Sequence, residues 1–461
     1  MFDVRLWILV LFLLRLENID LAPLDTHAYR QSLTLGVARN FLEWDANIFQ
    51  PRTILCDSRP GFEVMEFPVL NYAIFLMWKI FGEYNWCFRL LNLILASFGL
   101  WHFYKIARRV TNDRAALAST VLFGTSIAYI YARKAMPDVF SLSLVLIGVN
   151  MGWEYLERGK TWRLVAFTVA TALGLLSKIP AAAALVFLVL PYFDRTFEWK
   201  RKIRLTIGGA IAFAAMSAWY FVWIPWAEVE YHHGWFFRLG LERAWYELFI
   251  KFWDYTKERF FPIALQSRWA YLFLVSGLLL MIKEKQYTLL LNWFLYSAVF
   301  LCFMLQVGQT FSGHEYYVIP YVPIMALITG YGLSAMISNK WLYIAVLALL
   351  AGDAIHKKKE DFFIPYPEQK FLKLEQITDS VVPRDAMVVV RGREPDPSML
   401  YFAHRRGWSE GDRVRDPNWL NGEATVGLHY AIIDRTKLPD SIPYPMLFED
   451  NEFRIFKIKK D

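Results

Sequence analysis

The stretch "LWILVLFLLRLENIDLAPLDTHAYRQS", residues 6–32, joins an apolar run to a dense group of ionisable side chains. No small-residue cleavage site follows the run, so we predict an uncleaved membrane span over residues 5–21 instead of a signal peptide. Just beyond it, six positions hold a carboxylate, an imidazole, a phenol and a guanidinium: Asp25, His27, Tyr29 and Arg30. A charge at membrane depth is costly unless it is paired or lines a polar cavity. The stretch therefore predicts a membrane protein with a polar site at the end of its first span.

The composition excludes a single soluble core. Of the 461 residues, 56% are hydrophobic and 17% aromatic, whereas soluble domains are about 45–50% apolar. The net charge of +7 does not indicate nucleic-acid binding, because the basic residues lie in short loops between apolar runs, where they report topology. The three cysteines, Cys56, Cys87 and Cys302, are too widely spaced for a metal or disulfide framework.

Apolar runs predict ten further spans, eleven in all. They cover residues 86–104, 115–132, 139–156, 162–178, 180–193, 205–226, 267–282, 287–306, 317–337 and 341–356. The loops "KIARRVTNDR", "ERGKTWR", "DRTFEWKRKIR", "KEK" and "SNK" are basic and fall on the side of the N-terminus. The positive-inside rule then places the N-terminus in the cytoplasm and the C-terminal part outside, in a multi-pass membrane protein.

Two helices are expected on the membrane surface within the first outer loop, residues 22–85. The run over residues 67–82 is short for a bilayer and contains a proline near its start, and counting it as a span would reverse every later loop. In "SLTLGVARNFLEW", Leu33, Val37, Phe41 and Trp44 share one helical stripe, which predicts an amphipathic helix lying on the membrane.

Two other segments stand out by composition. The loop over residues 227–266 is rich in Trp and Phe interleaved with charge, as in an interfacial helix or an aromatic belt. From residue 357 the pattern changes: "AMVVVRG", "HYAIIDR" and "FRIFKIKK" read as strands and "EQKFLKLEQITDSV" as a helix. We therefore predict a mainly α membrane domain over residues 1–356 and a small soluble α/β domain over residues 357–461.

Ionisable and aromatic residues far apart in the sequence fall at the predicted outer face. Besides the four in the opening stretch, they are Arg52, Glu66, Arg133, Asp138, Lys178, His314, Tyr316 and Tyr317. Arg and Lys bind phosphate, and a carboxylate can act as general base on a hydroxyl. The set suits group transfer from a phosphate leaving group.

Structural roles stay open for several of these residues. Arg133 can bind a lipid headgroup or pair with Asp138, Lys178 can extend its amine to the membrane surface, and His314 can hydrogen-bond within the bundle. Asp25, a carboxylate just past a span and close to His27, favours a site role most.

Several segments, in order, resemble the GT-C glycosyltransferases, specifically the family-39 bacterial enzymes related to protein O-mannosyltransferases and aminoarabinose transferases. They are "DTHAYRQSLTLGVARNF", "FQPR" with "EFPVLNY", "ARKAMPD", "GLLSKIPA", "HEYYVIPYVP" and "MLYFAHRRGW". The resemblance implies a GT-C helical bundle with juxtamembrane helices, a polyprenyl-phosphate-linked sugar donor, and transfer with inversion on the periplasmic face.

The resemblance also implies roles for single residues. Asp25 matches the first-loop acidic residue that serves as base. Relatives often have Asp-Glu where this chain has Asp25 and Thr26, and aminoarabinose transferases usually have Lys where it has Glu66. Some relatives bind a divalent metal near this site, for which Glu66 and His27 are candidates; no cofactor is otherwise expected.

We predict an integral-membrane glycosyltransferase that acts on a lipid, glycan or protein acceptor. A flippase for lipid-linked sugars, an oligosaccharyltransferase-like enzyme acting on protein, and a non-catalytic subunit are the alternatives. A transporter would place its charges at the midplane of broken helices and show internal repeats, whereas here the charges gather at one predicted face.

Overall fold

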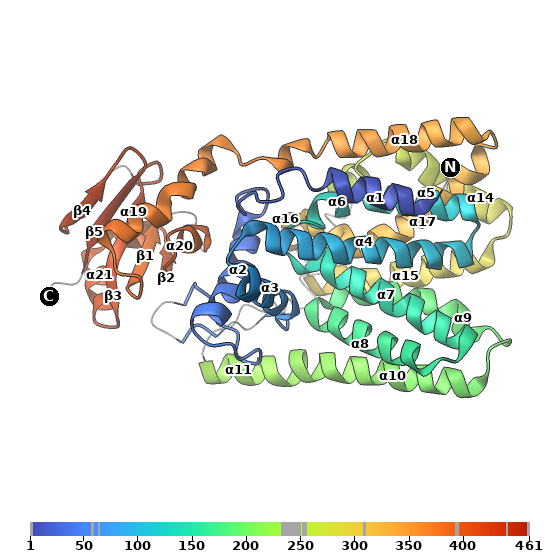
Figure 1. The fold of residues 1–461 in the computed structure, drawn as a ribbon, viewed down its shortest axis with the longest axis horizontal. Helices are drawn as coiled ribbons and strands as arrows, with labels where there is room; N and C mark the ends of the chain where they lie inside the picture. The colour runs from blue at the N-terminus through green and yellow to red at the C-terminus, as the bar shows by residue number, and fades with distance from the viewer. Residues whose placement is uncertain are drawn as a thin grey trace. The chain divides into compact units, whose positions relative to one another are not determined.

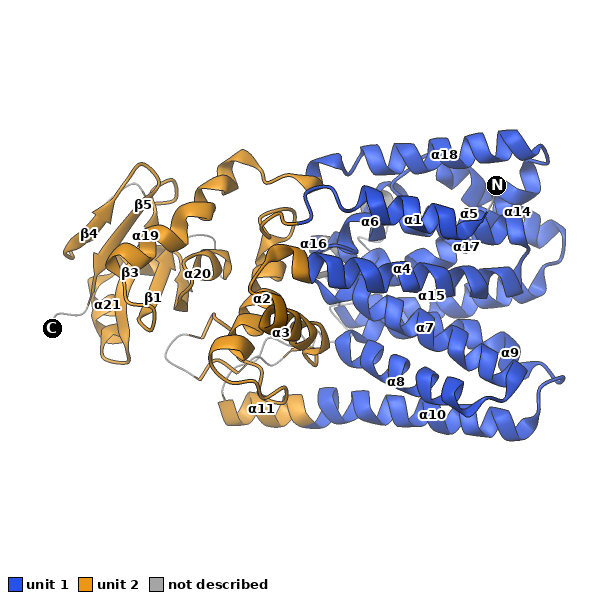
Figure 2. Cartoon of the chain, viewed as in Figure 1, with its two compact units in different colours: residues 1–19, 88–222, 236–360 blue, residues 20–87, 223–235, 361–461 orange. Residues whose placement is uncertain are grey.

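The computed structural model describes residues 3–56, 60–62, 65–231, 250, 256–307, 310–391, 396–438 and 441–458. The chain divides into two compact units, each formed from segments distant in sequence (Figure 2). The helical unit comprises residues 1–19, 88–222 and 236–360. The mixed unit comprises residues 20–87, 223–235 and 361–461. The loop after the first helix is thus grouped with the C-terminal residues.

Helices form nearly all of the described part of the helical unit (Figure 1). The α-helices are α1 (Val4–Leu14), α4 (Asn85–Val110), α5 (Asp113–Thr125), α6 (Ala128–Tyr131), α7 (Pro137–Arg158), α8 (Thr161–Ser177), α9 (Val189–Phe193), α10 (Trp199–Ser217), α14 (Ala270–Lys283), α15 (Tyr287–Val307), α16 (Thr310–Gly313), α17 (Val322–Met336) and α18 (Lys340–His356). Tighter or wider turns form η1 (Ile179–Leu188), η2 (Ala218–Trp223), η3 (Thr256–Ala264), η4 (Glu315–Tyr321) and η5 (Lys359–Phe362), the last of which ends in the mixed unit.

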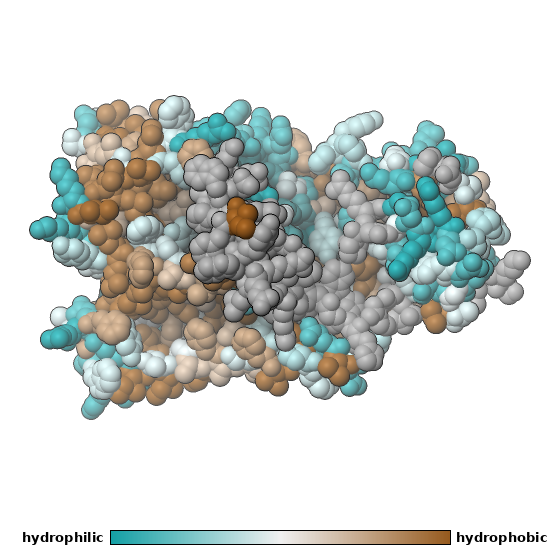
Figure 3. Space-filling view, turned by 180° about the vertical axis from the view of Figure 1, so that it is seen from behind, coloured by the Kyte–Doolittle hydropathy of each residue, from teal (hydrophilic) through white to brown (hydrophobic). Residues whose placement is uncertain are grey.

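Five of the described helical segments are long and apolar enough to cross a membrane. They are Asn85–Val110, Pro137–Arg158, Trp199–Tyr231, Tyr287–Val307 and Glu315–Met336. Apolar side chains cover much of this unit's surface in Figure 3. The chain is a multi-pass membrane protein. Each of the eleven predicted spans overlaps a helical segment, but the number eleven stays a prediction, because the other helices are shorter or less apolar.

Glycines let the helices of this unit pack closely. A Cβ at Gly148 of α7 would lie 2.5 Å from the Thr171 hydroxyl of α8, and one at Gly332 of α17 would strike the Phe273 carbonyl of α14. Small residues at such crossings allow van der Waals packing between helices where lipid removes the hydrophobic driving force. The predicted interfacial helix of residues 227–266 lies largely outside the described residues: its first part is seen in α11 (Ile224–Tyr231) and its last part in η3.

The C-terminal part of the mixed unit contains a five-stranded sheet of order β2-β1-β3-β5-β4. Its strands are β1 (Met387–Arg391), β2 (Arg406–Glu410), β3 (Leu428–Asp434), β4 (Met446–Glu449) and β5 (Phe453–Lys457). β1 pairs in parallel with β2 and β3, while β5 is antiparallel to β3 and β4. The helices here are η6 (Tyr366–Lys373), α19 (Leu374–Val381), α20 (Ser398–Phe402), η7 (Asp412–Arg415) and α21 (Pro417–Ala424).

The three predicted strands are present as β1, β3 and β5, and the predicted helix as η6 and α19. The sequence analysis missed β2 and β4, because β2 has neither an apolar run nor regular alternation and β4 is only four residues long. β2 reads Arg-Gly-Trp-Ser-Glu. β2 is held by backbone pairing instead. One edge pairs with β1, and the other edge contacts the first loop. There the Cys56 amide donates to the Gly407 carbonyl (3.1 Å), and the Gly407 amide donates to the Ile54 carbonyl (3.1 Å).

The first loop contributes two helices to the mixed unit, α2 (Ala28–Glu43) and α3 (Val69–Phe81), close to their predicted positions. The predicted amphipathic character of α2 is wrong. Every side chain from Arg30 to Phe41 is buried, including the charged Arg39. The reason is that α2 packs against both α3 and α20, so its polar side also has protein neighbours: the Arg39 guanidinium donates to the Tyr401 carbonyl (2.7 Å).

Candidate active site

Asp25 lies just before α2 and is 4% exposed. One carboxylate oxygen accepts a hydrogen bond from the side-chain amide of Gln31, in the first turns of α2. The positive end of the helix dipole favours a carboxylate at this position. His27, which lies between Asp25 and the first residue of α2, caps the helix and has a left-handed backbone conformation (φ 64°). Such strain in a non-glycine residue is typical of sites that a fold holds in place.

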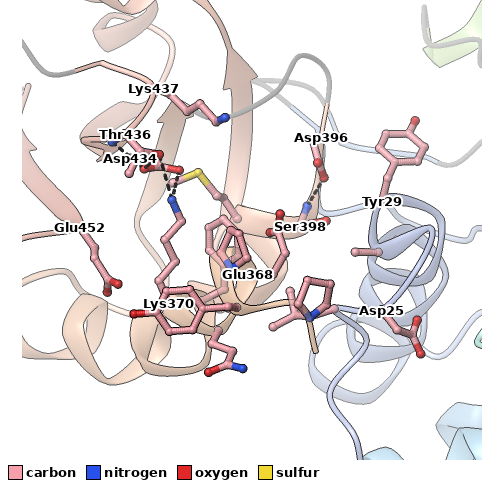
Figure 4. A pocket seen from close by; sticks show the side chains of 18 of the residues that line it. Asp25, Tyr29, Glu368, Lys370, Asp396, Ser398, Asp434, Thr436, Lys437 and Glu452 are labelled. Atoms are coloured by element: carbon pink, nitrogen blue, oxygen red, sulfur yellow. Dashed lines mark hydrogen bonds and ion pairs between the residues drawn. The ribbon is translucent and has the colours of Figure 1, made fainter. Parts of the chain in front are cut away.

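Asp25 lines a cavity of about 950 Å³ within the mixed unit, at the upper end of the range for ligand pockets. The first loop supplies one wall through Asp25, His27 and Tyr29, and the C-terminal part supplies the other (Figure 4). The lining side chains of that second wall include Tyr366, Glu368, Gln369, Lys370, Lys373, Asp396, Ser398, Asp434, Thr436, Lys437 and Glu452.

Two lysines of the second wall are held by carboxylates. The Lys370 amine lies 2.5 Å from Asp434, which is almost fully buried, and 3.1 Å from the Thr436 hydroxyl (Figure 4). The Lys373 amine lies 2.6 Å from Glu452. The wall therefore offers both signs of charge and hydroxyl groups, which suits a polar ligand.

Three further candidates of the first loop, Arg30, Glu66 and Arg52, form an ion pair or stack on aromatic rings. The Arg30 guanidinium lies 2.7 Å from the Glu66 carboxylate, and both side chains are largely buried. The Arg52 guanidinium packs over the rings of Trp44 (4.2 Å) and Phe62 (4.4 Å) and donates to the Pro60 carbonyl (3.1 Å). Arg52 thus has a clear structural role in ordering the loop.

Five other candidates come together in the helical unit. The Lys178 amine lies 3.0 Å from the buried Asp138 carboxylate, and 5.1 and 5.5 Å from the ring centres of Tyr316 and Tyr317. The His314 ring stacks on Tyr317. The sequence placed these residues at one predicted face, and the structure brings them into one cluster. Asp138 pairs here with Lys178.

Lys178 is placed by the end of α8. Lys178 follows the last residue of α8 and has an extended backbone conformation. The Ser141 hydroxyl of α7 donates a hydrogen bond to the Lys178 carbonyl (3.0 Å). Arg133 is 2% exposed, and its guanidinium donates to the Asn18 carbonyl (2.6 Å), after α1. A charge buried in this way within a membrane domain is typical of a functional or a structurally essential residue.

The sequence analysis missed several residues of these clusters. Gln31 was not named, although a carboxylate six residues before a helical glutamine lies within reach of it. Glu315 belongs to the ionisable residues of the predicted outer face but is not among the predicted site residues, yet it accepts from the Tyr131 hydroxyl (2.9 Å) and lies 3.6 Å from the Lys358 amine. The C-terminal wall of the cavity had no local signal, because it forms only when the chain folds back on the first loop.

A metal at Glu66 and His27 stays a prediction. The Glu66 carboxylate already faces the Arg30 cation, and a cation so close disfavours a second one there by Coulomb repulsion.

Comparisons with known proteins bear on the fold. Residues 59–223 match the family model described as dolichyl-phosphate-mannose-protein mannosyltransferase. A protein of Aquifex aeolicus (strain VF5), described as uncharacterized, is 26% identical over 271 residues, and the match spans 57% of this chain and 52% of that protein. The chain thus covers about half the length of this relative.

Solved structures match over more of the chain. The crystal structure of ArnT from Cupriavidus metallidurans in the apo state has a TM-score of 0.60 at 14% identity, over 99% of this chain and 98% of that chain. The same protein bound to undecaprenyl phosphate has a TM-score of 0.61 at 12% identity, with the same coverage. The oligosaccharyltransferase of Archaeoglobus fulgidus has a TM-score of 0.59 at 11% identity, over 94% of this chain and 69% of that chain.

Taken together, these findings define the class: the chain has the GT-C glycosyltransferase fold, as the sequence motifs predicted. Within that class, it is similar in fold to ArnT along nearly its whole length, and residues 59–223 match the protein-mannosyltransferase family model.

Proposed function

We propose that this protein is an integral-membrane glycosyltransferase that moves a sugar from a polyprenyl-phosphate-linked donor to an acceptor hydroxyl. The observation that carries the proposal is the buried Asp25 carboxylate at the wall of a cavity of about 950 Å³. The fold match to a protein solved with undecaprenyl phosphate supports the donor class.

In the proposed reaction, Asp25 takes the proton of the acceptor hydroxyl. The acceptor oxygen forms a bond to the anomeric carbon as the bond from that carbon to the phosphate oxygen breaks, with inversion. The polyprenyl phosphate leaves with the electron pair. Gln31 holds the Asp25 carboxylate by its hydrogen bond, which orients it toward the acceptor.

The leaving phosphate needs cations. Lys178 and Arg133 are the proposed donors to it. Arg133 is buried, and Lys178, whose side chain is 12% exposed, has aromatic neighbours in Tyr316 and Tyr317. Fixed charges in a dry site stabilise developing negative charge more strongly than they would in water. Arg52 is the weaker candidate, since its guanidinium is stacked between two rings.

The acceptor is proposed to contact the C-terminal wall of the cavity. Tyr366 lines it with 86% of its surface exposed, and Gln369 and Lys437 line it as well. An exposed aromatic ring with neighbouring polar groups suits a sugar or another polar acceptor better than an acyl chain.

The test uses purified full-length protein in detergent with undecaprenyl-phosphate-linked sugars and an envelope extract as acceptor. The readout is released undecaprenyl phosphate, the same product for every sugar. Asp25→Asn is expected to lower the rate by about 10²–10⁴-fold, the usual contribution of a general base. The matched control is Asp45→Asn in the same loop, which should keep the wild-type rate.

A wild-type rate in Asp25→Asn with normal folding contradicts the assignment of the base. A flippase would release no undecaprenyl phosphate in detergent, where no second compartment exists, and neither would a non-catalytic subunit. Mass spectrometry of envelope glycans with and without the gene then identifies the sugar and the acceptor.

A further inference from the structure

His404 makes a contact with a carboxylate at each of its two ring nitrogens. Nδ1 lies 3.0 Å from Glu375, and Nε2 lies 2.7 Å from Glu43. An ionised carboxylate only accepts hydrogen bonds, so both ring nitrogens must donate. An imidazole with two N–H groups is an imidazolium cation. The geometry alone therefore favours a charged His404.

The environment of His404 agrees with this charge. Burial alone would lower the pKa of His404, but the hydrogen bonds to Glu375 and Glu43 outweigh it and raise the pKa above its ordinary value. The same contacts hold the pKa of Glu375 at about 2, chiefly through the hydrogen bond from His404. Other groups that face this cluster, from α2, α19, α20 and the adjoining segments, are Arg39, Glu83, Asp379, Arg384, Tyr401 and Arg405.

The two carboxylates come from opposite ends of the sequence. Glu43 is the last residue of α2, the helix that follows Asp25, whereas Glu375 lies in α19 of the C-terminal part. The backbone at His404 is left-handed (φ 51°), and its neighbour Arg405 is anchored to Asp379 (3.0 Å) and to the Val382 carbonyl. His404 is thus held in a strained conformation that directs its ring between the two helices.

A second contact reinforces the first. Arg39, one helical turn before Glu43, donates to the Tyr401 carbonyl (2.7 Å) and packs over the Tyr401 ring (4.0 Å). α2 is therefore fastened to residues 401–404 at two successive turns, and only the His404 contact titrates near neutral pH.

A bound metal is the main alternative for these groups. Glu43, Glu83 and His404 place possible ligand atoms within 4.8 Å of one another. However, Arg39 lies 2.5 Å from Glu83, and both His404 nitrogens already face carboxylates. The arrangement is that of an ion-pair network and not of a vacant cation site.

We propose that His404 is a positioning residue, a pH-dependent clamp that fastens the end of α2 to α19 and thereby holds together the two walls of the Asp25 cavity. When the imidazolium loses a proton, one nitrogen becomes an acceptor facing a carboxylate, and that contact becomes repulsive. Because the folded-state pKa is raised, the stabilisation is complete below the unfolded value of about 6.5 and is lost as the pH rises through the folded-state value. The proposal does not depend on the reaction that the protein catalyses.

The test is the melting temperature of purified full-length protein in detergent, followed by tryptophan fluorescence from pH 5.5 to pH 9.5. His404→Gln keeps one donor but does not titrate. At pH 6 it should melt about 2–4 °C below the wild type, and the difference should shrink as the pH rises toward 9. His356→Gln, at the end of α18, is the matched control and should keep the wild-type profile.

If His404→Gln folds poorly, Glu43→Gln removes one carboxylate and should reduce the pH dependence while retaining the ring. Parallel pH profiles for the wild type and both variants would overturn the proposal. So would a Zn²⁺-dependent rise in the melting temperature of the wild type that His404→Gln lacks, since the cluster would then be a metal site.

Discussion

At the scale of single residues, Arg30 and Glu66 show how a substitution changes a site's chemistry. The resemblance to aminoarabinose transferases implies a lysine where this chain has Glu66, and here that carboxylate lies 2.7 Å from the Arg30 guanidinium. A lysine in its place would repel Arg30. The sequence identified both residues as candidates, but their partnership across 36 positions has no local signature.

A double-mutant cycle tests this pair. Arg30→Gln and Glu66→Gln should each destabilise the fold, because each leaves a largely buried charge without its partner. The double variant should recover part of the loss, with a coupling free energy of at least about 1 kcal/mol. The measurement is thermal unfolding of the four proteins. A coupling below about 0.3 kcal/mol, the range of independent sites, would contradict the pairing.

At the scale of elements, strand β2 depends on pairing and not on its own pattern. Gly407 accepts from Cys56 and donates to Ile54, so the first loop extends the sheet beyond β2. Its backbone has φ 142°, and a Cβ there would strike the Val388 carbonyl of β1. This position requires glycine for both conformation and close approach.

Gly407→Ala is therefore expected to destabilise the fold by at least about 2 kcal/mol, through backbone strain and the clash with β1. Gly422→Ala in α21 is the matched control: open space surrounds that position, and alanine favours a helix by up to about 1 kcal/mol. The measurement is the melting temperature, which should fall for the first variant and hold or rise for the second. Equal melting temperatures would mean that residues 54–56 and β1 do not constrain β2.

At the scale of the whole molecule, orientation in the membrane is the property that the sequence predicts most directly. The basic loops all fall on the predicted cytoplasmic side, and the residues after 357 on the other side. If so, the Asp25 cavity and the His404 clamp belong to the extracytoplasmic compartment, whose pH the clamp would sense.

Reporter fusions check this orientation. Alkaline phosphatase, which is active only outside the cytoplasm, should be active when fused after residue 461 and inactive when fused after Gly159 in the basic loop "ERGKTWR". A fluorescent protein that folds only in the cytoplasm should give the opposite pattern. Activity of the phosphatase at both positions would show that the predicted number of spans between them is wrong.

The sequence by itself determined the helical membrane part, its sidedness as a prediction, three of the five strands and the identity of Asp25 as a candidate. These features depend on hydropathy, periodicity and loop charge, which are local properties of the chain. Only the tertiary structure decided that Asp138 pairs with Lys178, that α2 is buried on all sides, and that His404 joins α2 to α19. The physical reason is that each of these contacts depends on how segments distant in the sequence pack together. A short stretch of sequence contains only one of the two partners.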